Sequence, residues 1–305
     1  MDLRFGYGTN GFTNHRLSDA LAVLSDLGYD GVALTLDHGH LDPYAEDLPR
    51  QVNALAGELA WYGLSVTVET GAPYLLDPWG KHEPTLMSEG AQRRVDLLRR
   101  AIWIAADLGS PTVHLCSGAA PKGLPEEDAW KRLTAGMETV LQTAEANGVT
   151  LAFEPEPYMF VDTVGRCLEL GKRLGGHELY GITLDIGHAH CVEEIPLLEC
   201  VQLAAPQLLN VQIEDMRRGV HQHLEFGEGE IDFVPVLAAL GGLGHQGLVS
   251  VEIQGGSLDA AEVARRSIEF LRRTALEAPT VQKEQREQKA QEEVQEAQAA
   301  QRARP

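Results

Sequence analysis

The run Leu151-Ala152-Phe153-Glu154-Pro155-Glu156 is apolar at its start and acidic at its end. A short continuous apolar run of this kind indicates a strand that is buried on both faces, and proline ends strand pairing because it lacks a backbone donor. Glu154 is therefore expected at the carboxyl end of a strand that covers residues 149–153. Its carboxylate should face a pocket rather than bulk water.

Three further apolar runs lead directly into oxygen-bearing side chains, at Asp185, Gln212 and Glu252. The intervals between these positions are close to the length of one strand-helix unit. Each residue taken alone fits an exposed position at a strand end. The recurrence favours a shared site, because clustered buried carboxylates repel one another and are costly to desolvate unless a cation lies between them. We therefore expect Glu154, Asp185, Gln212 and Glu252 to bind one divalent metal ion.

Strand and helix signals alternate along most of the chain. Its 305 residues, 44% of them hydrophobic, can bury one large core and match the usual size of a (β/α)8 TIM barrel. The expected strands cover residues 3–8, 31–36, 64–68, 112–115, 149–153, 181–184, 208–211 and 248–251. The expected helices cover residues 17–27, 48–62, 93–108, 129–147, 164–174, 195–204, 233–240 and 260–271. An open doubly wound sheet shows the same alternation, but only a closed barrel turns all the polar strand ends toward one funnel.

The last part of the chain has a different composition. Residues 1–275 are expected to form the barrel domain, with the last apolar helix ending near Leu271. Residues 276–305 are rich in Gln, Glu, Ala, Lys and Arg, which predicts a polar tail that is helical or disordered. Pro279 to Pro305 should be dispensable for folding.

Charge and cysteine content indicate the compartment and the partners. The formal net charge is -20, and such an acidic surface repels nucleic acid phosphates. The four cysteines show no C-x-x-C spacing and are expected to be reduced thiols. No signal-like segment opens the chain, and no apolar run is long enough to cross a bilayer. We expect a cytoplasmic protein without a nucleic-acid or membrane partner, and leave homo-oligomer formation open.

Histidines surround the expected metal site. They lie in expected carboxyl-terminal loops or strand ends, at positions His82, His114, His188, His221 and His223. Such a concentration favours binding roles over structural ones, most clearly for His188 and His223. Oxygen ligands suit Mn²⁺, Mg²⁺ or Co²⁺, and Zn²⁺ is also compatible.

A reaction can be argued from these residues. When a proton is taken from the carbon beside a carbonyl, charge builds on the carbonyl oxygen, and a metal bound to that oxygen stabilises it. Two carboxylates on opposite faces can remove and return the proton. Glu154 and Glu252 are the candidates for this pair.

Several motifs of the chain carry a resemblance to a known group. They are Ala105-Ala106-Asp107-Leu108-Gly109, Phe153-Glu154-Pro155, Leu184-Asp185-Ile186-Gly187-His188, Val211-Gln212-Ile213-Glu214-Asp215, Phe226-Gly227-Glu228-Gly229-Glu230-Ile231-Asp232 and Val251-Glu252. Over residues 1–275 the chain resembles the sugar phosphate isomerase/epimerase group of xylose isomerase-like TIM barrels. Relatives of that group include ketose 3-epimerases and endonuclease IV.

The resemblance implies residue roles. It assigns the metal to Glu154, Asp185, Gln212 and Glu252, proton exchange to the two glutamates, and substrate oxygens to His188 and to an arginine at Arg217 or Arg218. His82, His114 and His223 are further candidates for substrate binding. Gln212 departs from the family, which usually has histidine in an H-x-x-D motif. The implied function is a metal-dependent isomerase or epimerase that acts on a sugar, sugar phosphate or polyol-derived ketone by proton exchange beside a metal-bound carbonyl.

Two alternatives stay open. A polynuclear metal hydrolase of the endonuclease IV type would use residues near its three zinc positions, namely His82, His114, Glu154, Asp185, His188, Gln212, His221, His223 and Glu252. Gln212, His221 and the acidic surface argue against it. A non-catalytic barrel that binds a polyol or a protein has only Gln212 in its favour. The substrate is also open, although the lack of a Gly-rich phosphate loop makes a phosphate less favoured.

Overall fold

Eight parallel strands form a closed barrel in the computed structural model, which describes residues 3–278. The barrel strands are β1 (Arg4–Gly8), β2 (Gly31–Thr35), β3 (Ser65–Glu69), β4 (Thr112–Cys116), β5 (Thr150–Glu154), β6 (Tyr180–Asp185), β7 (Leu208–Ile213) and β10 (Leu248–Val251). Their order around the barrel is β1-β10-β7-β6-β5-β4-β3-β2, and neighbouring strands pair in parallel. The predicted (β/α)8 TIM barrel is confirmed.

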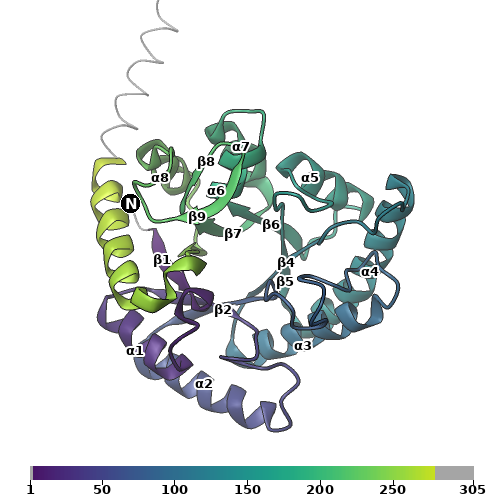
Figure 1. Cartoon of the computed structure of the whole chain (residues 1–305), viewed down its shortest axis with the longest axis horizontal. Helices are drawn as coiled ribbons and strands as arrows, with labels where there is room; N and C mark the ends of the chain where they lie inside the picture. Colours follow the sequence, from purple (N-terminus) through teal and green to yellow (C-terminus); the bar gives the residue numbers. More distant parts are fainter. Residues whose placement is uncertain (1–2, 279–305) are drawn as a thin grey trace, which may run out of the picture.

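Helices form a ring around the outside of the strands (Figure 1). They are α1 (Leu17–Asp26), α2 (Leu48–Tyr62), α3 (Gln92–Leu108), α4 (Glu126–Asn147), α5 (Val164–Arg173), α7 (Leu197–Ala204), α8 (Phe233–Gly242) and a last helix that includes residues 260–278. Helices α2, α3 and α4 end at Gly63, Gly109 and Gly148, each in the left-handed conformation that glycine adopts without steric cost.

The strand register places the polar strand ends at one level. Glu69 lies beside His114 in the β3–β4 pair, and Asp185 lies beside Gln212 in the β6–β7 pair. Glu154 ends β5 opposite Cys116 of β4. Because all eight strands run the same way, these side chains meet at the carboxyl end of the barrel.

Two features were not predicted. Helix α6 (Ile186–Val192) follows β6 directly, with the Asp185 carboxylate accepting a hydrogen bond from the His188 amide at 2.6 Å as the N-cap. An antiparallel hairpin, β8 (Asp215–Arg217) and β9 (Val220–Leu224), rises after β7 over the same end of the barrel (Figure 1). Both are short, and neither contains a long apolar run.

The last helix is longer than expected. The last helix continues past Leu271 through residue 278, and Ala278 is buried. Residues 279–305, where the predicted tail falls, lie outside the described part of the chain.

The cysteines are unpaired, and the helices are short or polar. Cys116, Cys167, Cys191 and Cys200 are all free thiols. Within residues 3–278, no helix is long and apolar enough to span a membrane.

Candidate active site

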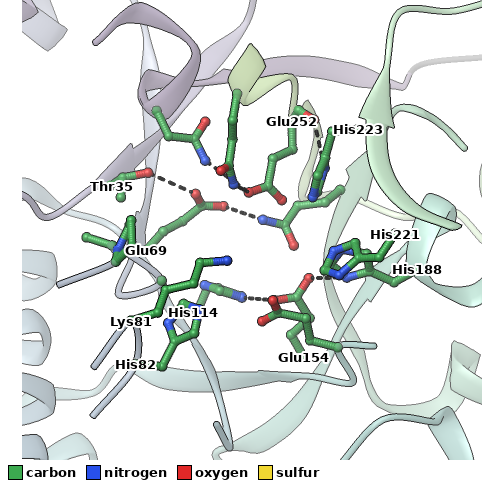
Figure 2. Close-up of a pocket in the computed structure, with 17 residues that line it drawn as sticks. Thr35, Glu69, Lys81, His82, His114, Glu154, His188, His221, His223 and Glu252 are labelled. Carbon is green, nitrogen blue, oxygen red and sulfur yellow. Dashed lines mark hydrogen bonds and ion pairs between the residues drawn. The ribbon is translucent and has the colours of Figure 1, made fainter. Parts of the chain in front are cut away.

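A cavity of about 190 Å³ opens at the carboxyl end of the barrel (Figure 2). It receives side chains from strand ends on all sides of the barrel and from the hairpin. Among the predicted site residues, its lining includes His82, His114, Glu154, His188, Gln212, His223 and Glu252.

Glu154 is held between two histidines. His114 Nε2 donates a hydrogen bond to Glu154 Oε2 at 2.7 Å, and His188 Nδ1 lies 3.1 Å from Oε1. Burial by itself would lower the pKa values of both histidines, but surrounding acids raise the pKa of His114 to about 9 and that of His188 to about 10. Burial would likewise raise the pKa of Glu154, but the two imidazoles hold that pKa well below its usual range. Glu154 is therefore an ionised carboxylate in a buried position.

Asp185 is 1% exposed and, unlike the other three predicted ligands, is not among the residues that line the cavity. One oxygen, Oδ1, caps α6. Asp185 can offer a ligand atom within 4.8 Å of one from each of Glu154 and His188, and likewise within 4.8 Å of one from each of His223 and Glu252. Asp185 is therefore close enough to share a cation with either of the two glutamates that the sequence predicts as catalytic.

Gln212 and Glu252 complete the predicted ligand set. Gln212 is 1% exposed, and its Nε2 donates to Glu69 Oε1 at 2.9 Å. Glu252 Oε1 accepts from Asn10 Nδ2 and Gln254 Nε2, each at 2.9 Å. Its backbone oxygen accepts from His223 Nδ1 at 3.1 Å.

Three histidines form a cluster beside these oxygens. The Nε2 atoms of His188 and His221 are 2.9 Å apart, and His188, His221 and His223 can place three ring nitrogens within 4.8 Å of one another. The hairpin supplies His221 and His223, so it brings nitrogen donors to a site whose barrel strands mainly supply oxygen. Burial, together with the nearby His188 and His223, lowers the pKa of His221 to about 4.

Comparisons with known proteins identify the family of this barrel. The family model for the xylose isomerase-like TIM barrel matches residues 21–274. The chain belongs to this family. L-ribulose-5-phosphate 3-epimerase from Salmonella paratyphi C is 24% identical over 250 residues, which cover 81% of this chain and 86% of the relative.

Solved xylose isomerase-like barrels share the fold. The structure of an L-ribulose 3-epimerase superposes with a TM-score of 0.75 and 23% identity, covering 92% of this chain and 97% of that one. The IOLI protein with a bound zinc atom gives a TM-score of 0.71 and 17% identity, covering 90% and 98%.

The donor set of this xylose isomerase-like barrel fits a divalent cation. Within residues 3–278, several buried side-chain oxygens have no hydrogen-bond partner, among them Asp185 Oδ2, Gln212 Oε1 and both carboxylate oxygens of Glu214. Burial also raises the pKa of Glu69 to about 8, against the effect of His114 and with added repulsion from Glu252 and Glu154. Unpartnered oxygens among crowded carboxyls are the arrangement that a divalent ion stabilises.

The structure does not bring the predicted arginine into the cavity. Arg217 is exposed and donates to the backbone oxygen of Glu228 at 2.9 Å. Arg218 is also exposed and donates to the backbone oxygens of His190 and Glu193. Both arginines therefore form hydrogen bonds to backbone oxygens in or next to the hairpin and not to groups in the cavity.

Other residues line the cavity without having been predicted. Lys81 extends its ammonium group into the centre of the cavity (Figure 2). Glu156 also lines it, and burial next to Glu154 raises the pKa of Glu156 to about 7. Asn10 and Glu69 contact predicted ligands directly. Glu156 follows an apolar run in the sequence and Glu69 ends one, so their positions at strand ends could have identified them as site residues. Lys81 lies in a long loop, where no sequence pattern indicates a site residue.

Proposed function

We propose that this protein is a sugar epimerase or isomerase that uses one divalent cation held by Glu154, Asp185, Gln212 and Glu252. The observation that carries the proposal is that Asp185 Oδ2 and Gln212 Oε1 are buried without a hydrogen-bond partner, next to a cavity that Glu154, Gln212 and Glu252 line. Membership of the xylose isomerase-like family and the sugar epimerases among its relatives support the same reading.

The chain's own residues suggest how a proton would be exchanged. Glu154 ends β5, and Glu252 follows β10, which lies on the opposite side of β6 and β7. The two carboxylates thus approach the cavity from different walls and could take and return a proton on opposite faces of a substrate carbon. A bound divalent cation would polarise the neighbouring carbonyl. The hydrogen bonds from Asn10 and Gln254 hold the Glu252 carboxylate in place.

The polar lining suggests a ketose as substrate. His82, His188 and His223 present ring nitrogens that can bind hydroxyl groups, and Lys81 can bind a substrate oxygen. We propose a small ketose, free or phosphorylated, with His114 acting on Glu154 rather than on the substrate, because its Nε2 is already bonded to that carboxylate.

Solvent exchange tests the proposal. The protein loaded with Mn²⁺ is incubated in D₂O with a panel of ketopentoses and ketohexoses and their phosphates. We expect a turned-over sugar to gain deuterium on the carbon beside the carbonyl. Turnover without solvent deuterium in the product would point to hydride transfer or hydrolysis and would overturn the proton-exchange proposal.

A polynuclear metal hydrolase is the second candidate, because His188, His221 and His223 form a nitrogen-rich cluster that adjoins the carboxylate ligands. Metal analysis of the protein purified without chelators separates the two functions. One ion per chain fits the epimerase, and two or three ions fit the hydrolase. The non-catalytic alternative and self-association stay open, and a cytoplasmic location and the absence of a nucleic-acid partner stay predictions.

A further inference from the structure

We infer that Glu69 is a positioning residue that orients the amide of Gln212, so that the amide oxygen rather than its nitrogen faces the cation. The inference rests on the proposed metal site. It concerns the one predicted ligand that departs from the family pattern.

The contact joins opposite sides of the barrel. Glu69 ends β3 and Gln212 lies near the end of β7, and these strands are separated by β4, β5 and β6 on one side of the closed sheet. Both side chains are buried, at 3% and 1% exposure. Glu69 Oε1 accepts from Gln212 Nε2 at 2.9 Å, which is the dashed line in Figure 2 that leaves Glu69 on the side away from Thr35.

The second oxygen of Glu69 is also engaged. Thr35 Oγ1, at the end of β2, donates to Glu69 Oε2 at 3.4 Å. Both carboxylate oxygens therefore act as acceptors, and the side chain is fixed from two strands. In contrast, Gln212 Oε1 has no partner within residues 3–278.

The chemistry of the two groups makes the orientation selective. The two ends of a glutamine amide have nearly the same shape, and rotation about the terminal bond exchanges them at low cost. An ionised carboxylate accepts hydrogen bonds and donates none, so it selects the NH₂ end, and a cation bound nearby would favour this ionised form of Glu69. The amide oxygen of Gln212 then points away from Glu69. Gln212 itself lies beside Asp185 in the β6–β7 pair. Without Glu69, the amide could rotate and turn its NH₂ group toward the cation part of the time. The NH₂ group is a hydrogen-bond donor and does not bind a cation.

Glu69 could instead act through its charge alone, by attracting the cation from nearby. The two roles predict different behaviour when residue 212 carries a carboxylate. The oxygens of a glutamate are equivalent, so Gln212→Glu has no orientation to select. A charge effect of Glu69 would persist in that background, whereas an orienting effect would vanish.

The experiment is a double-mutant cycle on Mn²⁺ affinity. The metal-free protein is titrated with Mn²⁺ by calorimetry as wild type, Glu69→Met, Gln212→Glu and the double variant. Methionine keeps the chain length and apolar volume but removes both acceptors. We expect Glu69→Met to weaken Mn²⁺ binding by about tenfold or more in the Gln212 background, as is typical when a residue behind a ligand is removed. In the Gln212→Glu background the same change should cause no loss, because it also removes a repelling charge.

Controls separate the outcomes. Glu156→Met removes a carboxyl that lines the same cavity without bonding to Gln212, and should weaken Mn²⁺ binding less than Glu69→Met. Circular dichroism and melting temperature report folding.

If Glu69→Met does not fold, Glu69→Gln replaces it. An amide at position 69 can donate to the Gln212 oxygen as well as accept from its NH₂ group, so this variant should also weaken Mn²⁺ binding. An equal loss in both backgrounds, or no loss in either, overturns the inference. A wild-type protein that binds no divalent metal would instead refute the proposed function.

Discussion

Asp185 has a central position among the proposed ligands, because it can share a cation with residues on both sides of the cavity. Asp185→Asn keeps an oxygen that can cap α6 but removes a charge. We expect metal affinity to fall by about tenfold or more, since affinity depends on the number of charged ligands. Calorimetric titration measures the change, and the circular dichroism spectrum should stay that of wild type. Unchanged metal affinity would show that Asp185 is not a ligand.

Glu154 and Glu252 can be tested as the bases of the reaction. Replacing either with Gln keeps one oxygen for the cation but removes the group that accepts a proton. We expect kcat to fall by about 10² to 10⁴, with a smaller effect on metal binding. Steady-state kinetics and metal titration on the same preparations distinguish these effects. A variant that loses metal as strongly as it loses activity would argue for a ligand role alone.

His82 should stay neutral well into the acid range. Burial, together with the charges of Lys81 and Arg94, lowers its pKa to about 4. The unfolded chain, with the ordinary pKa of 6.5, binds the proton first. The contribution of His82 to stability is therefore present above pH 6.5 and is lost as the pH falls from about 6.5 toward 4.

Two measurements check this behaviour. An NMR titration should give His82 a midpoint well below 6.5, and His82→Asn should make the free energy of unfolding less dependent on pH between 7 and 5. A midpoint near 6.5 would show that the ring is exposed to water.

At the scale of elements, the β8–β9 hairpin and the loop after it depend on Asp215. Its Oδ1 accepts from the amides of Met216 and Ile231 at 2.9 and 3.1 Å, and its Oδ2 accepts from that of Gly227 at 2.8 Å. The side chain is 2% exposed. It therefore ties the loop after the hairpin back to the barrel, with His221 and His223 held over the cavity.

Removal of this anchor should be costly. Asp215→Ala removes the acceptor of three backbone amides, of which that of Met216 is buried, and we expect it to reduce the free energy of unfolding by about 3 kcal/mol. Asp232→Ala is the matched control, because Asp232 caps α8 through a single hydrogen bond and its loss should cost about 1 kcal/mol. Urea unfolding measures both. Equal losses would contradict the anchoring role.

At the scale of the whole molecule, the barrel should fold without the residues after Ala278. Truncation after Ala278 should leave the melting temperature nearly unchanged, because the predicted tail has few apolar residues to bury. Truncation after Leu271 is the control. It removes the buried residues Thr274 and Ala278 and should lower the melting temperature. A loss of many degrees on removal of residues 279–305 alone would show that they pack on the barrel or on another subunit.

Local patterns predicted much of this barrel. Apolar runs located the strands, glycines such as Gly109 located helix ends, and the strand-end positions of Glu154, Asp185, Gln212 and Glu252 predicted a shared site. These features depend on neighbours in the chain, because strand burial and helix termination follow from short-range patterns. The hairpin was missed because its residues lack a sustained apolar period.

Closure of the barrel determined which distant residues contact one another. Glu69 was recognisable as a strand end, but its bond to Gln212 exists only because the closed sheet turns β3 and β7 toward each other across the cavity. Arg217 was expected at the substrate, but the turn of the hairpin directs it to the backbone of Glu228. The sequence alone determined which residues end the strands. Only the tertiary structure determined which of them meet, because contacts across a barrel depend on the direction of each chain segment in space and not on the residues beside it.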